Sequence, residues 1–486
     1  MRFLMPLAAV ALLAQTAQAQ TKATLTLDEA ITLARRNNPT FRTTVNARRS
    51  ADAQMRSAFA GLLPSVSANL SGRYQQTGQQ FVQGIALQNQ SDILQSSYGI
   101  GVSYTLNSDV LTSPRQTTAA RNAAEADVTG ASELLRATVT QQYLLVLQSQ
   151  ARAALQDTLL QTTQGQLELA KARQAVGAGT ILDVRRAEVA AGNSEVQVLQ
   201  SHNTAEVEML RLFQQLGVSQ PDSIDLTTRF EIIPVNFDLD SLLAVAQARN
   251  PLLEAARSRE HAATVNVRAN QGRYLPSLTL QTGWGGNASK LVDEQVAVAN
   301  ARGAVEGRRS GCFAEDSLRA ASGMARLDCS VLPQWSSTLE QNTISQNNRF
   351  PFSFTPAPRS VSAFVSLPIF DNLVREQRLQ EASIQRDNAK LTVRARELQT
   401  IADVTQAYRN LQTAVRTTQL QEVNAQRARE ELSFAEERYR VGAATFLDVT
   451  TSRGTFEQAQ IDRLNASYDY HRAFAALENA VGRPLR

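Results

Sequence analysis

Four short segments of the chain alternate between apolar and small polar residues. They are residues 65–74, 98–106, 277–284 and 361–370. In the second segment every other residue from Tyr98 to Leu106 is apolar, and glycine, serine or threonine stands between them. Because side chains alternate between the two faces of a strand, each segment predicts a β-strand with one apolar and one polar face. Strands of about ten residues with aromatic ends are typical of membrane β-barrels, although any one of them also suits a half-buried soluble sheet.

Helical patterns with few apolar positions cover most of the remaining chain. Ile401, Val404, Tyr408, Leu411 and Val415 step by three and four, which is the narrow apolar seam of a coiled coil. The pattern predicts helices near residues 28–60, 114–175, 181–215, 240–273, 372–439 and 447–480. Two shorter helices in each half together match the length of the long one, so we expect them to stack end to end along it. An ordinary long helical bundle is the alternative for these helices alone.

The sequence matches itself in two halves. Leu63–Ser65 recurs as Leu275–Ser277, and Val176–Val184 recurs with substitutions as Val441–Val449. Matching segments in the same order indicate an internal duplication rather than separate domains. We expect a signal peptide at 1–19, a first repeat at 20–236, a second repeat at 237–486 and, within the second, an extended extracellular loop at 285–360.

The first residues have the pattern of a secretory signal. Arg2 precedes an apolar run from Phe3 to Leu13, and Ala17-Gln18-Ala19 forms a cleavage site. The run is too short to span a membrane, and no cysteine follows the cleavage site. We therefore expect an exported chain without an N-terminal lipid anchor.

Composition narrows the class further. The chain has 486 residues, 43% hydrophobic and 19% charged, and no later apolar run reaches the ~18 residues that a spanning helix needs. Its net charge of +4 comes from interspersed arginines and acids, so we expect no nucleic acid as a partner. His202, His261 and His471 have no partners at metal-ligand spacing and are expected on solvated helix faces. Without a phosphate loop or a nucleophile motif, we expect neither an enzyme nor a metal or cofactor.

Four strands cannot close a membrane barrel, because an open sheet edge is not tolerated in lipid. Copies of the chain must therefore share one barrel. A dimer would supply eight strands with little bore, and a trimer twelve strands with an open lumen. The expected fold class is an α+β membrane protein, internally duplicated, in which a homotrimer shares a 12-stranded β-barrel with four strands per chain.

These features together resemble the TolC-type outer-membrane efflux proteins, over essentially the whole mature chain. The matching motifs are Leu27-Asp28, Leu63-Pro64-Ser65, Leu367-Pro368-Ile369-Phe370-Asp371 and Val-Gly-x-x-Thr-x-Leu-Asp-Val in both hairpins. The resemblance implies a barrel in the outer membrane and a long α-helical coiled-coil cylinder in the periplasm. It also implies a passive exit duct for an inner-membrane pump, reached through a periplasmic adaptor, in tripartite efflux or type I secretion.

The two hairpin turns have the residues of strong helix ends. Gly177 and Gly442 suit the positions that end the long helices. Thr180 and Thr445 suit N-caps, with Asp183 and Asp448 three residues later as capping boxes. Capping alone accounts for these aspartates. The functional alternative, compatible with it, is that a trimer repeats each carboxylate in a ring that attracts cations or basic partners.

The resemblance assigns roles at these hairpin tips. It implies that Asp183 and Tyr439 take part in links between coiled coils in the closed state, and that Asp448 belongs to the pore constriction. Ala444 and Thr451 stand where the family pattern has a gating arginine and a second aspartate. We therefore expect fewer polar links and weaker cation selectivity. Adaptor contacts are expected at the tips, at Gly177, Thr180, Gly442 and Thr445.

Cys312 and Cys329 lie in the 285–360 segment, which is far longer than residues 75–97 at the corresponding place in the first half. An exported chain favours a disulfide between them, with two free thiols as the alternative. A plug, a phage receptor and a contact with neighbouring proteins all fit this segment.

Two other functions fit part of the pattern. A periplasmic coiled-coil adaptor or scaffold without a barrel would have helical hairpins but no need for four strands with aromatic ends. A diffusion porin would not need the long helices. We expect opening at 176–184 and 441–449, with energy from the pump, and the polar lumen fits drugs, metal ions and secreted protein alike.

Overall fold

A computed structural model describes residues 23–77, 81–82, 85–86, 91–221, 224–232 and 237–485. The expected signal peptide lies outside the described residues. The chain forms two compact units. The helical unit contains Met1–Met55, Gln116–Val267 and Gln380–Arg486, and the strand unit contains Arg56–Arg115 and Arg268–Leu379.

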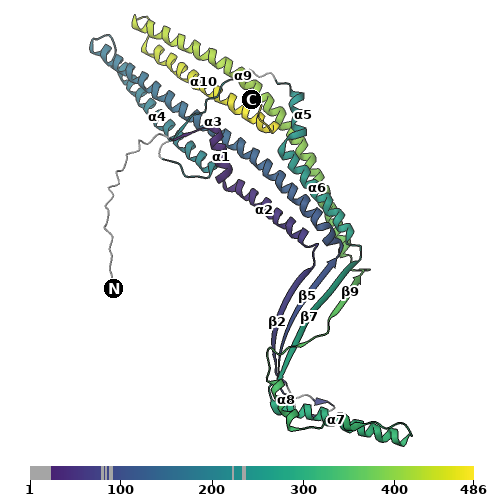
Figure 1. Ribbon diagram of the computed structural model, residues 1–486. Coiled ribbons are helices and arrows are strands. Elements are labelled where there is room, and N and C mark those ends of the chain that lie inside the picture. Colours follow the sequence, from purple (N-terminus) through teal and green to yellow (C-terminus); the bar gives the residue numbers. More distant parts are fainter. Residues whose placement is uncertain are drawn as a thin grey trace, which may run out of the picture. The chain divides into compact units, whose positions relative to one another are not determined.

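Long antiparallel helix pairs build most of the helical unit (Figure 1). In the first half the elements are β1 (Ala23–Leu25), α1 (Leu27–Asn37), α2 (Pro39–Ala60), α3 (Ser108–Ala175), α4 (Ile181–Leu216) and β6 (Ile224–Leu226). In the second half they are α5 (Leu239–Arg249), α6 (Pro251–Gly272), α9 (Val374–Arg440) and α10 (Phe446–Val481). Helix α4 folds back along α3, and α10 folds back along α9.

Each of the two predicted helices at 28–60 and 240–273 is in fact two helices. The breaks fall at Asn38 and Asn250, because each precedes a proline, which disfavours the helical conformation of the residue before it. The side-chain amides of both asparagines form hydrogen bonds at these breaks. Asn38 Nδ2 donates to the Gln215 carbonyl at 2.8 Å, and Asn250 Nδ2 donates to the Ala480 carbonyl at 2.9 Å. Both asparagines thus satisfy backbone groups at the ends of α4 and α10.

Among the described residues, the helical unit has one large core in each half, and a smaller cluster of Ala170, Val184, Ala187 and Phe446 joins the two halves near the tips. The first is centred on Tyr143, which is fully buried together with Leu212 and Leu216. The second is centred on Tyr470, Phe474 and Leu477, and it adds Val404 and Leu411 of the predicted seam. Short apolar seams between long polar helices are therefore sufficient to hold the hairpins in place.

Strands β1 and β6 form a parallel pair that the sequence did not indicate, because each has only three residues. The Tyr143 hydroxyl donates to the Leu25 carbonyl at 2.8 Å and accepts from the Thr228 backbone N–H at 3.3 Å. This hydroxyl joins α3 to the strand pair, and it meets the rule that a buried polar group finds partners.

The expectation for His471 was wrong. Its side chain is 4% exposed and packs among the rings of Phe230, Tyr468 and Tyr470 instead of facing solvent. The surrounding rings come partly from another segment of the chain, so the local helical pattern could not indicate this burial. His202 is exposed as expected and lies 3.0 Å from the Asp157 carboxylate.

The strand unit is an antiparallel sheet in the order β2, β5, β7, β9. Its strands are β2 (Ser65–Gln75), β5 (Ile93–Leu106), β7 (Ser277–Leu291), β8 (Thr355–Pro356) and β9 (Ser360–Ser366). Strand β8 pairs with β7 beyond the end of β9. A separate short pair joins β3 (Phe81–Val82) to β4 (Ile85–Ala86). All four predicted strands are present. Strands β5 and β7 extend well beyond their predicted bounds, and β2 is longer by one residue.

The predicted end of the last strand was wrong. Strand β9 stops at Ser366 instead of continuing to residue 370. Pro368 has no backbone N–H with which to continue a ladder, and Asn372 and Leu373 have left-handed backbones, with φ of 57° and 65°. The chain turns there towards α9.

The register places the predicted apolar residues on one face. Leu70 stands opposite Tyr98, and Ile100 stands opposite Trp284. Leu70 is 74% exposed and Val365 is 73% exposed, so this apolar face is open to the surroundings. The sheet has two outer strands, β2 and β9, and in the described part of the chain each pairs along one side only.

The segment 285–360 contains more structure than the predicted loop. Strand β7 continues to Leu291, and α7 (Glu294–Ala321), the 3-10 helix η1 (Cys329–Val331) and α8 (Ser337–Asn347) follow. Cys312 and Cys329 are joined by a disulfide. Beside it the buried Asp316 carboxylate accepts from Arg326 at 2.8 Å and from the Leu327 backbone N–H at 2.8 Å. Together these contacts hold η1 against α7.

Across the described residues, no helix has both the length and the apolar content needed to cross a membrane.

Candidate functional site

The two hairpin turns of the helical unit have nearly the same geometry. Gly177 and Gly442 follow the long helices with φ of 76° and 78°, a conformation that other residues rarely adopt. The N–H of Ala178 donates to the Arg173 carbonyl at 2.8 Å, and the N–H of Ala443 donates to the Arg438 carbonyl at 2.8 Å. These bonds satisfy carbonyls at the helix ends and turn the chain sharply at both tips.

Both predicted capping boxes are present. The Asp183 backbone N–H donates to the Thr180 hydroxyl oxygen at 3.2 Å, and the Asp183 carboxylate accepts from the Thr180 N–H at 3.1 Å. In the second turn the Asp448 N–H donates to Thr445 Oγ1 at 3.3 Å, and the Asp448 carboxylate accepts from the Thr445 N–H at 2.8 Å. All four side chains therefore begin helices at the two tips.

The Asp448 carboxyl has a lowered pKa. The Thr445 backbone N–H is the main cause, followed by the Thr445 hydroxyl and the positive charge of Arg438. All three favour the charged form of a fully exposed carboxyl. Asp448 is thus a solvent-facing negative charge at the hairpin tip.

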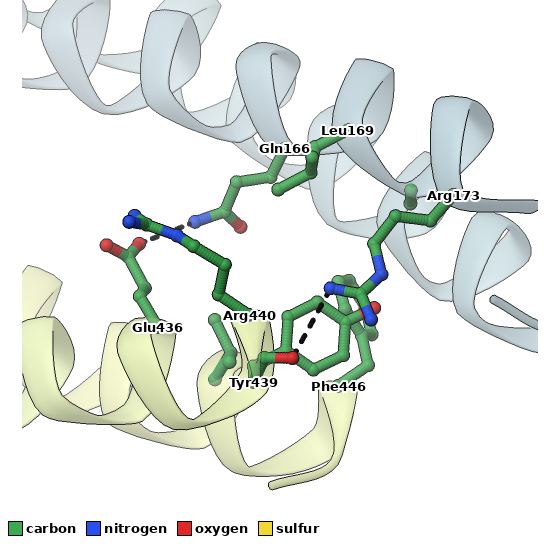
Figure 2. Close-up of a pocket in the computed structure, with 9 residues that line it drawn as sticks. Gln166, Leu169, Arg173, Glu436, Tyr439, Arg440 and Phe446 are labelled. Carbon is green, nitrogen blue, oxygen red and sulfur yellow. Dashed lines mark hydrogen bonds between the residues drawn. The ribbon is translucent and has the colours of Figure 1, made fainter. Parts of the chain in front are cut away.

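A cavity of about 310 Å³ lies between the two hairpins near their tips (Figure 2). Gln166, Leu169 and Arg173 of α3 line one side. Glu436, Tyr439 and Arg440 of α9 line the other side, and Phe446 and Val449 of α10 complete it. The cavity is therefore bounded by both hairpins, and its size depends on their separation.

Two polar contacts cross this cavity. Gln166 Nε2 donates to Glu436 Oε1 at 3.1 Å, and Arg173 Nη1 donates to the Tyr439 carbonyl at 3.3 Å. The Arg173 guanidinium carbon also lies 4.3 Å from the centroid of the Tyr439 ring, which is a cation–π distance. Figure 2 shows both side chains of α3 reaching towards α9.

The structure places the candidate residues in two groups. Tyr439 lies in the cavity between the hairpins, where its ring is 5.9 Å from the Phe446 ring. Asp183 stays in its own capping box with Thr180 and is not part of the cavity lining. Within one chain, Tyr439 therefore meets Arg173 rather than Asp183.

A second charged group lies behind the cavity. Arg453 of α10 is 6% exposed, and its Nη2 lies 3.9 Å from Glu436 Oε1. Among the residues that the structure describes, its Nε and Nη2 atoms find no hydrogen-bond partner. Burial lowers the pKa of Arg453 and raises the pKa of Glu457. Glu436 thus stands between an amide donor on α3 and a buried cation on α10.

No sequence motif pointed to Gln166, Arg173, Glu436 or Arg453. A signal was present, because Gln166 and Arg173 are seven residues apart, and Glu436 and Tyr439 are three apart. Residues at these spacings share a helix face. The pattern does not say which helix that face meets.

The remaining candidates are Cys312 and Cys329, whose disulfide belongs to the strand unit and lies outside the hairpin site. Within the ranges that the structure describes, no three His, Cys, Asp or Glu side chains gather where a metal ion could be held.

A family model described as outer membrane efflux protein matches residues 30–218 and 314–483. Among solved structures, the Campylobacter jejuni CmeC outer membrane channel is similar with a TM-score of 0.71 at 15% identity, over 94% of this chain and 85% of that one. The Vibrio cholerae outer membrane protein VceC is similar with a TM-score of 0.67 at 18% identity, over 95% and 97%. The open state of the Neisseria gonorrhoeae MtrE outer membrane channel is similar with a TM-score of 0.67 at 18% identity, over 95% and 89%. No curated protein sequence matches the chain.

Proposed function

The chain belongs to the outer membrane efflux protein family, and on that premise we propose that three copies form one passive duct through the outer membrane and into the periplasm. An inner-membrane pump supplies the substrates, and a periplasmic adaptor connects the pump to the duct. The match covers most of both halves of the chain, so the premise applies to both helical hairpins.

The exposed four-stranded sheet is the main support for this proposal. Its apolar face suits lipid, and its other face is rich in glycine, serine and amide side chains. In lipid the outer edges of β2 and β9 would leave backbone groups without partners, each at a cost of several kcal/mol. Pairing β2 of one copy with β9 of the next satisfies both edges. Three copies then close a barrel of twelve strands, which is wide enough for a water-filled lumen.

The helical unit supports a periplasmic continuation of this lumen. The two halves of the chain present the same sequence of elements: two short helices, a strand pair, a long helix, a capped turn and a returning helix. We take this order, with the repeated motifs, as an internal duplication. Long helices with narrow apolar seams need neighbours on either side. Side-by-side packing of the hairpins of three copies supplies them and produces a hollow cylinder.

Contacts across the cavity between the hairpins support a closed resting state. If the hairpins move apart at their tips, the bond from Gln166 to Glu436 and the contacts of Arg173 with Tyr439 must break. A duct closed by a few such contacts opens at a modest energetic cost. We propose that adaptor hairpins dock on the tips, at Gly177, Thr180, Gly442 and Thr445, and offset that cost.

Three copies of Asp448 would form a ring of negative charge at the constriction. Each carboxylate is exposed and held in its charged form by Thr445 and Arg438. Such a ring attracts cations and is a binding site for divalent ions. Asp183 repeats the same capping geometry in the first hairpin and completes the acidic tips.

Single-channel recording in planar bilayers tests the duct and its gate together. We expect the purified chain to form channels, and we expect Gln166→Ala combined with Arg173→Met to raise their conductance. Gln148→Ala is the matched control, because Gln148 of α3 donates across to Asn465 of α10 at 2.9 Å but does not line the cavity. An equal rise in both variants would contradict a gate at the tips.

The alternative is a periplasmic adaptor or scaffold without a barrel. Such a protein would be released with the periplasmic contents, whereas a barrel protein remains in the outer membrane until detergent is added. Recovery of the full-length chain in the soluble periplasmic fraction would favour the alternative and remove the premise of the bilayer experiment.

A further inference from the structure

One charged side chain lies on the polar face of the four-stranded sheet. The register joins Arg73 of β2 to Gln95 of β5, and Gln95 to Ser289 of β7, all on the face opposite the apolar one. Every other residue on this face of β2, β5, β7 and β9 is uncharged. The rung is near the end of the strands that leads into α7 and α8, as Figure 1 shows for β7.

The connection beside Arg73 brings no negative charge. Residues 76–91, which join β2 to β5, contain neither aspartate nor glutamate. Asp92 is the first acid, and its carboxylate is engaged by the hydroxyl of Tyr74 and by the Thr77 backbone N–H at 2.9 Å. Tyr74 stands on the apolar face, so this carboxylate is drawn away from Arg73.

At this end of the sheet, the two acidic residues at the start of α7 also accept hydrogen bonds. Asp293 accepts from the first N–H groups of α7, and Glu294 accepts from Asn348 Nδ2 at 2.6 Å. A second cation adds to the positive charge, because Arg349 lines the same cavity as Gln95. These hydrogen bonds do not remove the charges of Asp92, Asp293 and Glu294, but none of the three is among the paired residues of the polar face, where Arg73 is the one charged residue.

We infer that Arg73 makes the strand end of the duct favour anionic solutes over cationic ones. The inference rests on the proposed function, because closure of three sheets turns the polar face into the lumen wall and repeats Arg73 three times. A guanidinium remains charged at any physiological pH, so the three charges are permanent. Arg73 is thereby a specificity-determining residue for the part of the path that the sheet encloses.

Ionic strength determines the distance over which the electrostatic potential of such a ring extends. The Debye length is ~30 Å at about 0.01 M salt and ~3 Å at about 1 M. At low salt the potential of three arginines extends across the lumen, and at high salt it is confined to the wall. A genuine charge effect must therefore decrease as salt is added, whereas a steric effect must not.

The test measures the local potential by thiol chemistry, so it is independent of the state of the hairpin tips. Ser71 precedes Arg73 by two residues on the same face, and Ser71→Cys introduces a reporter thiol of similar size. The native cysteines are joined to each other and leave the reporter as the reactive thiol. Anionic and cationic methanethiosulfonates are added to the protein in outer membranes, and the ratio of their two reaction rates is recorded.

We expect the ratio of anionic to cationic rates to fall roughly threefold or more when Arg73→Gln is added at low salt, and further with Arg73→Glu. The difference should disappear near 1 M salt. Lys290→Gln is the matched control, because Lys290 stands one rung away on the apolar face. It removes a positive charge at the same end of the sheet but from the other face, and it should lower the ratio by less than Arg73→Gln does.

The outcomes separate the inference from its premise. Leu70→Cys, on the apolar face, should react slowly with both charged reagents if that face contacts lipid. Fast labelling of Leu70→Cys with no labelling of Ser71→Cys would overturn the barrel itself. Labelling of Ser71→Cys with a ratio insensitive to Arg73, or equally sensitive to Lys290, would overturn the role of Arg73 and leave the barrel standing.

Discussion

At the scale of single residues, Tyr439 makes its contact through the ring and the backbone. Arg173 lies over the ring face and donates to the backbone carbonyl, and neither contact uses the hydroxyl. We therefore predict that Tyr439→Phe leaves the closed state intact, and that Tyr439→Ala shifts the closed–open equilibrium towards open by roughly two- to fivefold, as expected for loss of a cation–π contact of about 0.5–1 kcal/mol. Single-channel open probability measures both. Equal opening in the two variants would mean that the Tyr439 hydroxyl, and not its ring, holds the closed state.

Asp448 has two separable roles, as a cap and as a charge. Asp448→Asn keeps an acceptor oxygen for Thr445 but removes the charge, so it should weaken block of the channel by divalent cations. Thr445→Ala keeps the charge and should cost about 1 kcal/mol of helix stability while leaving the block nearly unchanged. Current recordings with added divalent cation compare the two. If Thr445→Ala abolished the block as fully as Asp448→Asn, the helix start and not the charge would bind the cation.

The lowered pKa of Asp448 has a definite consequence for pH dependence. Because hydrogen bonds from Thr445 favour the charged form, the pKa of the Asp448 carboxyl lies below its ordinary value of 3.8. The capping contribution is present above that value and is lost as pH falls through the lower pKa of the folded state. We predict that the midpoint for loss of the divalent block lies below 3.8, the ordinary value for an aspartate. A midpoint near pH 5 or above would assign the block to another group.

At the scale of elements, the disulfide closes a small segment beside α7. Cys312 and Cys329 are 17 residues apart. In the chain-entropy model, a disulfide that closes a loop of that length stabilises the folded state by about 3 kcal/mol. We predict that a Cys312→Ser, Cys329→Ser double variant still enters the outer membrane, because the sheet does not depend on η1. Protease should cleave the connection after α7 at least tenfold faster in this variant.

Alkylation provides the control for this prediction. The native protein should gain no mass from a thiol reagent until it is reduced, and it should then gain two adducts. Unchanged protease sensitivity in the double variant would mean that the bonds of Asp316 to Arg326 and Leu327 hold the segment without the disulfide.

The helices and strands also show how much of the fold a local sequence pattern predicts. The strand segments and the capped turns follow from contacts between residues two to four positions apart, and the structure contains them where the sequence predicts them. The breaks at Asn38 and Asn250 were missed, although each precedes a proline, because the apolar pattern continues across them. The helices of the 285–360 segment were missed because most of α7 is exposed and lacks a strong apolar seam.

At the scale of the whole molecule, the free edges of the sheet make a prediction about assembly. Cysteines at Ser67 or Asn69 of β2, combined with Ser362→Cys of β9, place one thiol on each outer strand. Oxidation should link the copies into covalent dimers and trimers and nothing larger, because three four-stranded sheets close the ring. Denaturing gels report the ladder, and each single-cysteine variant should stay monomeric there. A ladder that continues past three, or stops at two, would contradict the trimer.

The sequence by itself determined the strand positions, the alternation of their faces, the long helices and both capped turns, because these depend on residues that are close along the chain. It also indicated the duplication and the family. Only the tertiary structure decided that Gln166 meets Glu436, that Arg173 covers Tyr439, and that Arg453 and His471 are buried. It also decided the strand register, which makes Arg73 the one charged residue on the polar face of the sheet. These features join residues that are tens to hundreds of positions apart, and the packing of whole elements, which local periodicity does not specify, brings them together.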